Sequence, residues 1–224
     1  MRRTSGLAGG LRALAGVFVA SAFGGQALAA DFLEGPAAAT WSGAYVGAVA
    51  GSAKASTVWR GINGNTAVLD LAPRGGLVGV TAGVNRQTGL WVLGVEGDFA
   101  WADLNDTIAS GCIGGPCRAE TNWLSTARLR LGAASGALLV YGTGGLAFGL
   151  VDIAAPGIPA HESQWHIGWA AGFGAELAIA PRVTLKAEWL HYDLAERVHH
   201  PVPYPPLDVG EGGQILRVGI NWRL

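Results

Sequence analysis

The chain has 224 residues, of which 36 are glycine, 50% are hydrophobic and 14% are charged. Ordinary soluble domains carry about 7% glycine and about 25% charged residues. A chain this apolar, with nine Trp, excludes intrinsic disorder, and a formal net charge of -1 argues against nucleic acid as a partner.

The first 30 residues predict a secretory signal peptide. Three arginines stand within the first 12 residues, and an apolar run over 14–23 leads to the small-x-small motif Ala27-Leu28-Ala29. The run is too short for a transmembrane helix. We therefore predict a cleaved signal peptide over residues 1–29 and an exported domain over 30–224. A retained anchor helix is the alternative, which the Gly-Gly-Gln after the run disfavours.

The exported part remains apolar, yet no later stretch reaches 18 consecutive apolar residues. It therefore lacks a candidate transmembrane helix. In hydrocarbon only helices and closed barrels satisfy every backbone polar group. The sequence thus predicts an all-β chain that crosses a membrane as a barrel.

Segments with a period of two follow one another along this part of the chain. In residues 91–101, Trp91, Leu93 and Val95 share one face, while Glu96 and Asp98 lie on the other. Five segments alternate cleanly and three do so less cleanly, because Gly and Ala occupy both faces. The eight segments are 41–51, 75–85, 91–101, 123–133, 138–149, 165–179, 183–189 and 216–224. They predict an eight-stranded antiparallel up-and-down transmembrane β-barrel.

The connections alternate between long and short. Those predicted to be long span residues 52–73, 103–120, 151–164 and 195–212, whereas the others are tight turns. Long extracellular loops and short periplasmic turns are typical of outer-membrane barrels. The sequence therefore predicts the outer membrane of a Gram-negative bacterium as the location, with outer-membrane lipid and lipopolysaccharide as neighbours.

Seven Trp residues fall near the ends of the predicted strands. They predict two aromatic girdles, one at each membrane interface. The periplasmic girdle comprises Trp41, Trp91 and Trp222, and the outer girdle Trp101, Trp123, Trp165 and Trp189. The alternative is that these rings form the core of a soluble sandwich, which would leave glycine exposed on the opposite face.

The inward positions carry charges of both signs. An eight-stranded barrel is only just wide enough for side chains to fill it. The predicted lumen network comprises Glu96, Asp98, Arg128, Arg130, Glu176, Lys186, Glu188, Arg217 and Arg223. These side chains either pair and plug the lumen, or they line a narrow polar path for small solutes.

Several motifs resemble the alphaproteobacterial outer-membrane β-barrel family of small surface proteins, of the opacity and outer-membrane-protein-A type, often labelled the porin family. They are residues 41–47 (WSGAYVG), 89–98 (GLWVLGVEGD), 128–132 (RLRLG), 141–147 (YGTGGLA), 186–194 (KAEWLHYDL) and 217–224 (RVGINWRL). The resemblance implies a role in envelope integrity and host contact, with haem binding in some members, and no enzyme activity. Members usually end in Phe, which the barrel-assembly machinery reads, whereas this chain ends in Leu224.

The remaining candidate groups lie in the predicted loops. Cys112 and Cys117 predict a local disulfide in an oxidising compartment, with two free thiols as the alternative. His199, His200 and Tyr204 are weak candidates for binding haem or a metal, although solvated loop residues are the commoner case. No cofactor is therefore predicted, and a ligand on a host surface is a possible partner of the loops.

Catalysis is not predicted. A lipid hydrolase on such a barrel would need a Ser and a His on the outer face near the outer leaflet, held by a carboxylate. His191 has a suitable place on its strand, but no Ser stands near it in the sequence.

Overall fold

The computed structural model describes residues 40–61, 67–112, 115–154, 162–199 and 207–224. Its regular elements are all strands. They are β1 (Gly43–Gly61), β2 (Ala67–Leu71), β3 (Arg74–Thr88), β4 (Trp91–Cys112), β5 (Gly115–Ser135), β6 (Leu138–Ala154), β7 (Glu162–Ala180), β8 (Val183–His199) and β9 (Leu207–Arg223). Within the described ranges, no helix is long and apolar enough to cross a membrane. The predicted signal peptide lies outside the described residues.

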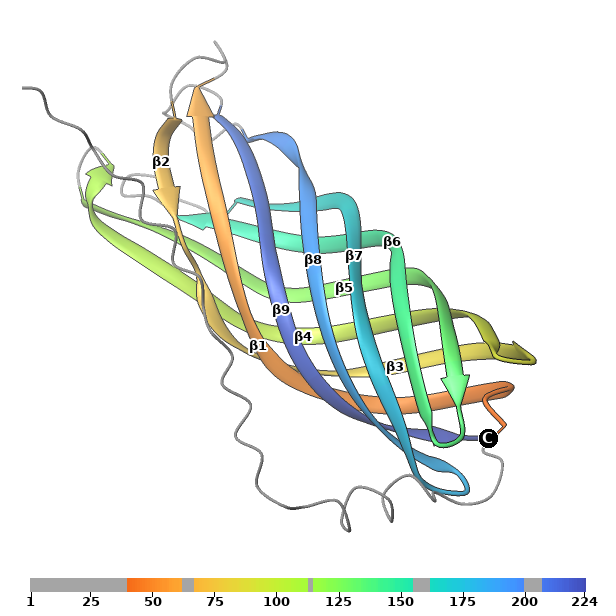
Figure 1. The fold of residues 1–224 in the computed structure, drawn as a ribbon. Coiled ribbons are helices and arrows are strands. Elements are labelled where there is room, and N and C mark those ends of the chain that lie inside the picture. The colour runs from red at the N-terminus through yellow and green to blue at the C-terminus, as the bar shows by residue number, and fades with distance from the viewer. Residues whose placement is uncertain (1–39, 62–66, 113–114, 155–161, 200–206) are drawn as a thin grey trace, which may run out of the picture.

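The strands close into a barrel (Figure 1). Neighbours in the sheet pair antiparallel, and β1 pairs with β9 to close the cylinder. β2 and β3 both pair with β1, and only Ala72 and Pro73 separate them along the chain. Because proline has no backbone N–H to donate, it interrupts the ladder at this point. Nine strand segments therefore build eight antiparallel barrel strands, which confirms the predicted fold.

One end of the barrel has tight turns. Gly89 and Gly136 begin two of these turns with φ angles of 59° and 57°, in the left-handed region that glycine adopts at little cost. The C-terminus lies at the same end (Figure 1). Short turns mark the periplasmic end of an outer-membrane barrel, so the opposite end is extracellular.

The strands run further toward the extracellular end than the alternation predicts. β4 continues to Cys112 and β5 begins at Gly115, so most of the predicted loop 103–120 is strand. Most of the predicted loops 52–73 and 195–212 is strand as well, and so is half of 151–164. The predicted strand ends were wrong because the apolar-out pattern is needed only in hydrocarbon, whereas backbone pairing can continue beyond it.

Above the membrane the barrel divides into two sheets, which we call the two-lobed rim. Pairing between β3 and β4 ends at Arg74 and Asn105, and pairing between β7 and β8 ends at Gly168 and Leu194. All other neighbouring strands stay paired beyond these points. One lobe therefore contains β8, β9, β1 and β2, the other contains β4 to β7, and the two diverge in Figure 1.

A side chain bridges the base of each seam between the lobes. The Ala72 N–H donates to Asp106 Oδ2 at 2.8 Å, which joins the β2–β3 break to β4. His166 Nδ1 lies 3.0 Å from Ala195 O, which joins β7 to β8. The lobes are thus connected where they leave the closed barrel.

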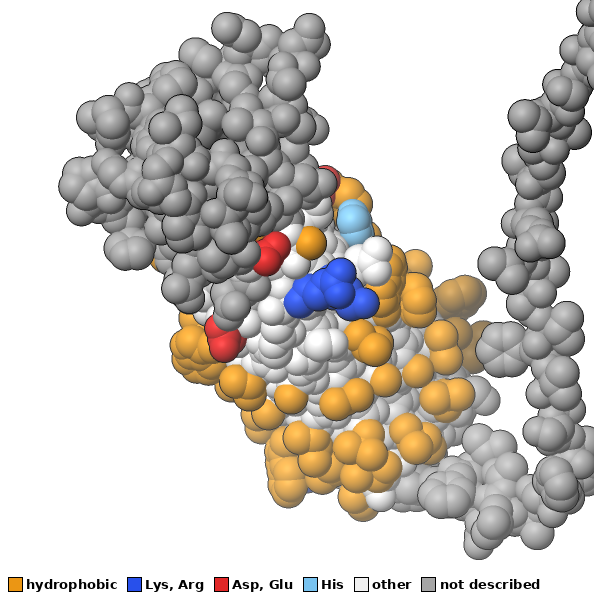
Figure 2. Space-filling model, turned by 90° about the vertical axis from the view of Figure 1, so that its left-hand side faces the viewer, with side chains coloured by type: hydrophobic (Ala, Val, Ile, Leu, Met, Phe, Trp, Pro, Cys, Tyr) orange, Lys and Arg blue, Asp and Glu red, His pale blue; other side chains and the backbone are white. Residues whose placement is uncertain are grey.

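The outer wall and the interior have opposite character. Large apolar side chains cover the wall, as in the hydrophobic band of Figure 2, and Leu129 is 62% exposed. The alternate positions point inward and are buried, among them Glu96, Arg128 and Lys186. The wall therefore suits lipid, and the chemistry of the barrel lies inside.

Candidate functional site

Eight charged side chains meet at the centre of the barrel, and we call them the charged layer. They are Glu96 and Asp98 of β4, Arg128 and Arg130 of β5, Glu176 of β7, Lys186 and Glu188 of β8, and Arg217 of β9. Each side chain is at most 4% exposed. Four carboxylates face four cations, so the layer is neutral when all eight groups are ionised.

Glu96 is at the centre of the charged layer. Its carboxylate lies 2.7 Å from Arg128 Nη2, 3.2 Å from Arg130 Nη1 and 2.9 Å from Lys186 Nζ. The Tyr45 hydroxyl donates to it at 2.7 Å. Three cations from two strands therefore contact this buried carboxylate closely, and Arg217 Nη2 of β9 lies 3.8 Å from it.

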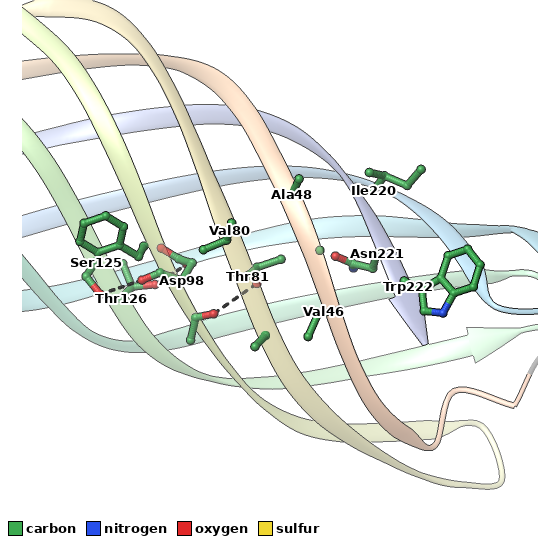
Figure 3. Close-up of a pocket in the computed structure, with 14 residues that line it drawn as sticks. Val46, Ala48, Val80, Thr81, Asp98, Ser125, Thr126, Ile220, Asn221 and Trp222 are labelled. Carbon is green, nitrogen blue, oxygen red and sulfur yellow. Dashed lines mark hydrogen bonds between the residues drawn. The ribbon is translucent and has the colours of Figure 1, made fainter. Parts of the chain in front are cut away.

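Asp98 and Glu188 share two arginines on the neighbouring side of the layer. Arg217 Nη2 lies 2.9 Å from Asp98 and 2.6 Å from Glu188, and Arg128 contacts both carboxylates at 2.9 and 3.2 Å. Thr126 also donates to Asp98 at 2.7 Å, and the two side chains point toward one another in Figure 3. Each carboxylate thus has several donors, the condition under which burial of an ion pair is tolerated.

Arg130 and Glu176 complete the layer toward the periplasm. Arg130 Nη2 lies 2.8 Å from Glu176, and its guanidinium sits 3.9 Å from the centre of the Tyr141 ring. Glu176 also accepts hydrogen bonds from Thr184 and, at 2.9 Å, from Asn221. The aromatic faces therefore add a cation–π contact to the ion pair.

Apolar side chains fill the barrel on both sides of the charged layer. The periplasmic apolar layer consists of Trp41, Val92, Ala134, Ala137, Leu139, Tyr141 and Ala178. The outer apolar layer consists of Ala53, Ala55, Leu77, Ala100, Ala102, Leu104, Leu124, Ala147, Ala170, Leu190, Tyr192, Leu194 and Ile215. The interior is therefore a stack of three layers, with the ions between two apolar layers.

Arg223 and Trp41 lie elsewhere than predicted. Arg223 was predicted to join the lumen network, but its guanidinium donates to the carbonyl oxygens of Thr40 and Pro181 at the periplasmic edge. Trp41 was predicted in the lipid-facing girdle, yet it is 2% exposed and lies near Arg223. The Trp41 prediction was wrong, because Trp41 has the same inward alternation as Tyr45 and Val49. Arg223, the last residue of β9, also has an inward position, but it bonds to backbone carbonyls at the barrel mouth and not to the carboxylates of the charged layer.

The other six predicted girdle Trp residues lie on the outer wall. Trp91, Trp101, Trp165 and Trp222 are exposed, and Trp123 and Trp189 are half-buried. Trp123 contacts Phe99 and Trp165, with ring centres 5.7 and 4.4 Å apart. Part of the outer girdle is therefore a continuous aromatic surface.

The loop candidates give no described site. His200 and Tyr204 lie outside the described residues, and the side chains of His199, Cys112 and Cys117 lie outside those that the structure describes. Among the described residues no group of three or more His, Cys, Asp and Glu could hold a metal ion. The disulfide and the haem or metal ligands therefore remain predictions.

Sequence reasoning missed the hydroxyl and phenol groups of the interior. Tyr45, Tyr141, Thr126 and Thr184 all donate to carboxylates of the charged layer. The sequence could have revealed them, because each stands two residues away from another inward-facing position of its strand. A second polar contact lies nearer the extracellular end, where Thr121 and Tyr192 donate to the buried Glu211.

A hollow of about 850 Å³ lies along the wall formed by β9, β1, β3, β4 and β5 (Figure 3). Its apolar lining includes Val46, Val80 and Trp222, which are exposed on the wall. Its polar lining includes Asp98 and Thr126, which bond to each other. The hollow is thus part of the lipid-facing surface. Asp98, the one carboxylate in its lining, already accepts a hydrogen bond from Thr126.

Replacing Gly174 with Ala is expected to destabilise the barrel by about 1–3 kcal/mol, because it overpacks the interior. A Cβ at this position would lie 2.6 Å from the Tyr141 hydroxyl and 2.8 Å from Ala187 O. The matched control is Gly142→Ala on the outer wall, whose Cβ would meet only Gly172 O at 4.0 Å. Urea unfolding of both variants measures the difference, and equal stability of the two would contradict the packing.

Comparison with known proteins places this architecture in a family. The profile of the family described as "Outer membrane protein beta-barrel domain" matches residues 15–222. A 31 kDa outer-membrane immunogenic protein of Brucella melitensis biotype 1 is 35% identical over 232 residues, covering 92% of this chain and 96% of that protein. A 22 kDa outer membrane protein of Rhizobium leguminosarum bv. viciae is 31% identical over 114 residues, covering 51% and 50%.

A solved structure shares the fold. The outer membrane protein OprG from Pseudomonas aeruginosa superposes with a TM-score of 0.50 at 11% sequence identity, covering 82% of this chain and 97% of that one. The family match spans nearly the whole chain, and both relatives are named as outer-membrane proteins. The chain therefore belongs to the outer membrane protein beta-barrel domain family and is a β-barrel protein of the bacterial outer membrane.

Proposed function

We propose that this barrel is a non-conducting, non-catalytic protein of the outer membrane, with a structural role and a surface-interaction role exerted at its two-lobed rim. The observation that carries the proposal is the charged layer enclosed by two apolar layers. Such an interior stabilises a closed cylinder and offers no open path from one side of the membrane to the other. The interaction role of the protein then lies at the rim, where the strands leave the membrane.

The charged lumen is also what a narrow porin for small solutes would contain, so conduction is the second candidate. A conducting path needs charged side chains that water and solutes can reach. Here every member of the charged layer is engaged by opposite charges, and hydrophobic constrictions exclude water from a pore. These contacts favour a plug over a channel.

The rim supports a role in contact with a host surface or another ligand. Strand pairing continues above the membrane-spanning part, and each lobe is a sheet with two edges at the seams. Exposed edges offer backbone donors and acceptors to an extended segment of a partner. Haem binding is a minor alternative, which rests on the family resemblance and on His199, His200 and Tyr204.

Planar-bilayer conductance of the folded, detergent-extracted protein tests the proposal. We expect no current steps from protein whose insertion is verified independently, while an unrelated porin in the same bilayer conducts. The neutral, paired interior leaves no mobile path for ions. Discrete and reproducible steps from the inserted protein would overturn the plug and establish the narrow porin.

A further inference from the structure

Two cations stand directly opposite one another on the outer wall. Lys54 of β1 pairs in register with Arg74 of β3, and both side chains are exposed. The Ala55 N–H donates to Pro73 O at 2.8 Å, so the next pair along, Lys54 and Arg74, is of the non-hydrogen-bonded type. In that type the facing Cα atoms are only about 4.5 Å apart. The two positive side chains therefore leave the wall side by side.

This pairing is unfavourable unless an anion joins it. Like charges directly opposite one another on neighbouring strands destabilise a sheet. Among the residues that the structure describes, neither Lys54 nor Arg74 forms an ion pair. The cations of the charged layer, by contrast, all contact carboxylates. A negatively charged group from outside the chain would remove the repulsion.

The cation pair lies just beyond the lipid-facing surface. Lys54 is the next outward residue after Ser52, which pairs with Leu216, itself 61% exposed. Arg74 is four residues beyond Val78, which pairs with the girdle residue Trp101, about 13 Å along the strand. Figure 2 shows adjacent Lys and Arg side chains immediately beyond the hydrophobic band. This is the level at which the headgroups of the outer leaflet lie.

Small residues leave room beneath the two cations. Ser52 and Gly76 face each other between the cation pair and the apolar band. A Cβ at Gly76 would meet only Gly51 O, at 3.9 Å, so this stretch of wall is open. A headgroup can therefore lie against the backbone here while its hydrocarbon continues down the wall.

Polar groups extend the cation pair along the neighbouring strands. Lys54 pairs in register with Gln214 of β9, which pairs with His191 of β8, and both are accessible. The exposed carboxylates nearby are Asp103 of β4 and Asp193 of β8. Neither lies in the row formed by His191, Gln214, Lys54 and Arg74. The row itself presents donors and positive charge.

We propose that Lys54 and Arg74 bind a phosphate of the phosphorylated glycolipid in the outer leaflet, the lipid A part of lipopolysaccharide. The guanidinium of Arg74 can engage two phosphate oxygens, and Lys54 adds a point charge. Gln214 and His191 donate along the same row, and the acyl chains lie against the apolar band below. A phosphate-binding site next to the apolar band of the wall favours a lipid over a soluble anion. The proposal does not depend on whether the lumen conducts.

The test compares two forms of the lipid. Binding of bis-phosphorylated lipid A and of dephosphorylated lipid A with the same acyl chains is measured for the intact protein in detergent micelles. The double variant Lys54→Gln/Arg74→Gln removes both cations of the proposed phosphate site. The matched control is Arg86→Gln/Arg182→Gln, which removes two exposed cations at the periplasmic end.

The wild type and the control are expected to prefer the phosphorylated lipid by about 30-fold, since each cation near a membrane surface contributes about 1 kcal/mol. The double variant is expected to lose that preference. An unchanged preference in a folded double variant would overturn the proposal. Displacement of the lipid by millimolar inorganic phosphate would overturn the choice of a lipid and indicate a site for soluble anions.

A measurement on the unaltered protein covers the case in which the double variant does not fold. Salt screens exposed charges, with a Debye length of about 10 Å at 0.1 M and about 3 Å at 1 M. The preference for the phosphorylated lipid is therefore expected to fall steeply between these concentrations. A preference that salt leaves unchanged would show that the exposed cation pair does not carry it.

Discussion

Replacing Glu96 with Gln is expected to lower the free energy of unfolding by about 3–5 kcal/mol, the usual cost of removing one partner from a buried ionic network. The carboxylate holds Arg128, Arg130 and Lys186 together in the middle of the barrel. With a neutral amide in its place, the charged layer has one excess positive charge, which is buried between two apolar layers. Urea unfolding of the barrel in micelles, followed by Trp fluorescence, measures the loss.

Two further variants separate this cause from a general effect of mutation. Asp193→Asn removes an exposed carboxylate of β8 and is expected to change stability by less than about 0.5 kcal/mol. Glu96→Gln combined with Lys186→Met removes one charge of each sign and restores neutrality. The double variant is expected to be at least about 0.5 kcal/mol more stable than the sum of the two single changes predicts. Strict additivity would argue against a coupled network.

Replacing Leu129 with Arg is expected to impair insertion and to destabilise the inserted barrel by about 2–4 kcal/mol, the cost of an arginine at the bilayer midplane. Leu129 is fully outward-facing at the middle of the predicted segment 123–133, between Ala127 and Leu131. The guanidinium would lie in hydrocarbon, without a carboxylate among the described residues to pair with it. Folding into lipid bilayers, measured as the folded fraction and its urea midpoint, reports the effect.

Leu90→Arg is the matched control, because the cost of the charge depends on depth. Leu90 is 52% exposed but lies in the periplasmic turn, where the cost near the interface is about 0–1 kcal/mol. The two variants have the same change of residue and differ in depth. If Leu129→Arg folds into bilayers as well as Leu90→Arg does, the assignment of the outer face is wrong.

The closed barrel and the charged layer could be predicted from the alternation of inward-facing and outward-facing residues alone. Side chains of a strand alternate strictly between two faces, so one apolar face fixes where every other residue points. Arg128 and Arg130 are separated by Leu129, and Glu96 and Asp98 by Gly97, and this spacing puts all four charges inside. Eight segments of suitable length with that pattern then leave little choice of fold.

The alternation of residues does not predict which charged side chains form ion pairs or where the strands end. The contact of Glu96 with Lys186 joins strands that are not neighbours, and it depends on register and on the curvature of the barrel. Trp41 and Arg223 keep the inward alternation of their strands, but alternation does not reveal that Arg223 bonds to backbone carbonyls at the barrel mouth. In the outer parts of the strands the apolar-out pattern is replaced by apolar residues that point inward, such as Ala53 and Leu104, because hydrocarbon no longer imposes an apolar outer face.

The division of the outer end into two lobes has a consequence for how the sequence can vary. Backbone pairing joins the strands of the two lobes only within the closed barrel, where the β3–β4 ladder ends at Arg74 and the β7–β8 ladder ends at Gly168. A change of length in the hairpin of β4 and β5 therefore has no backbone ladder through which to displace β8, β9, β1 or β2. At the extracellular end, the length and sequence of one lobe can therefore change without shifting the strand register of the other.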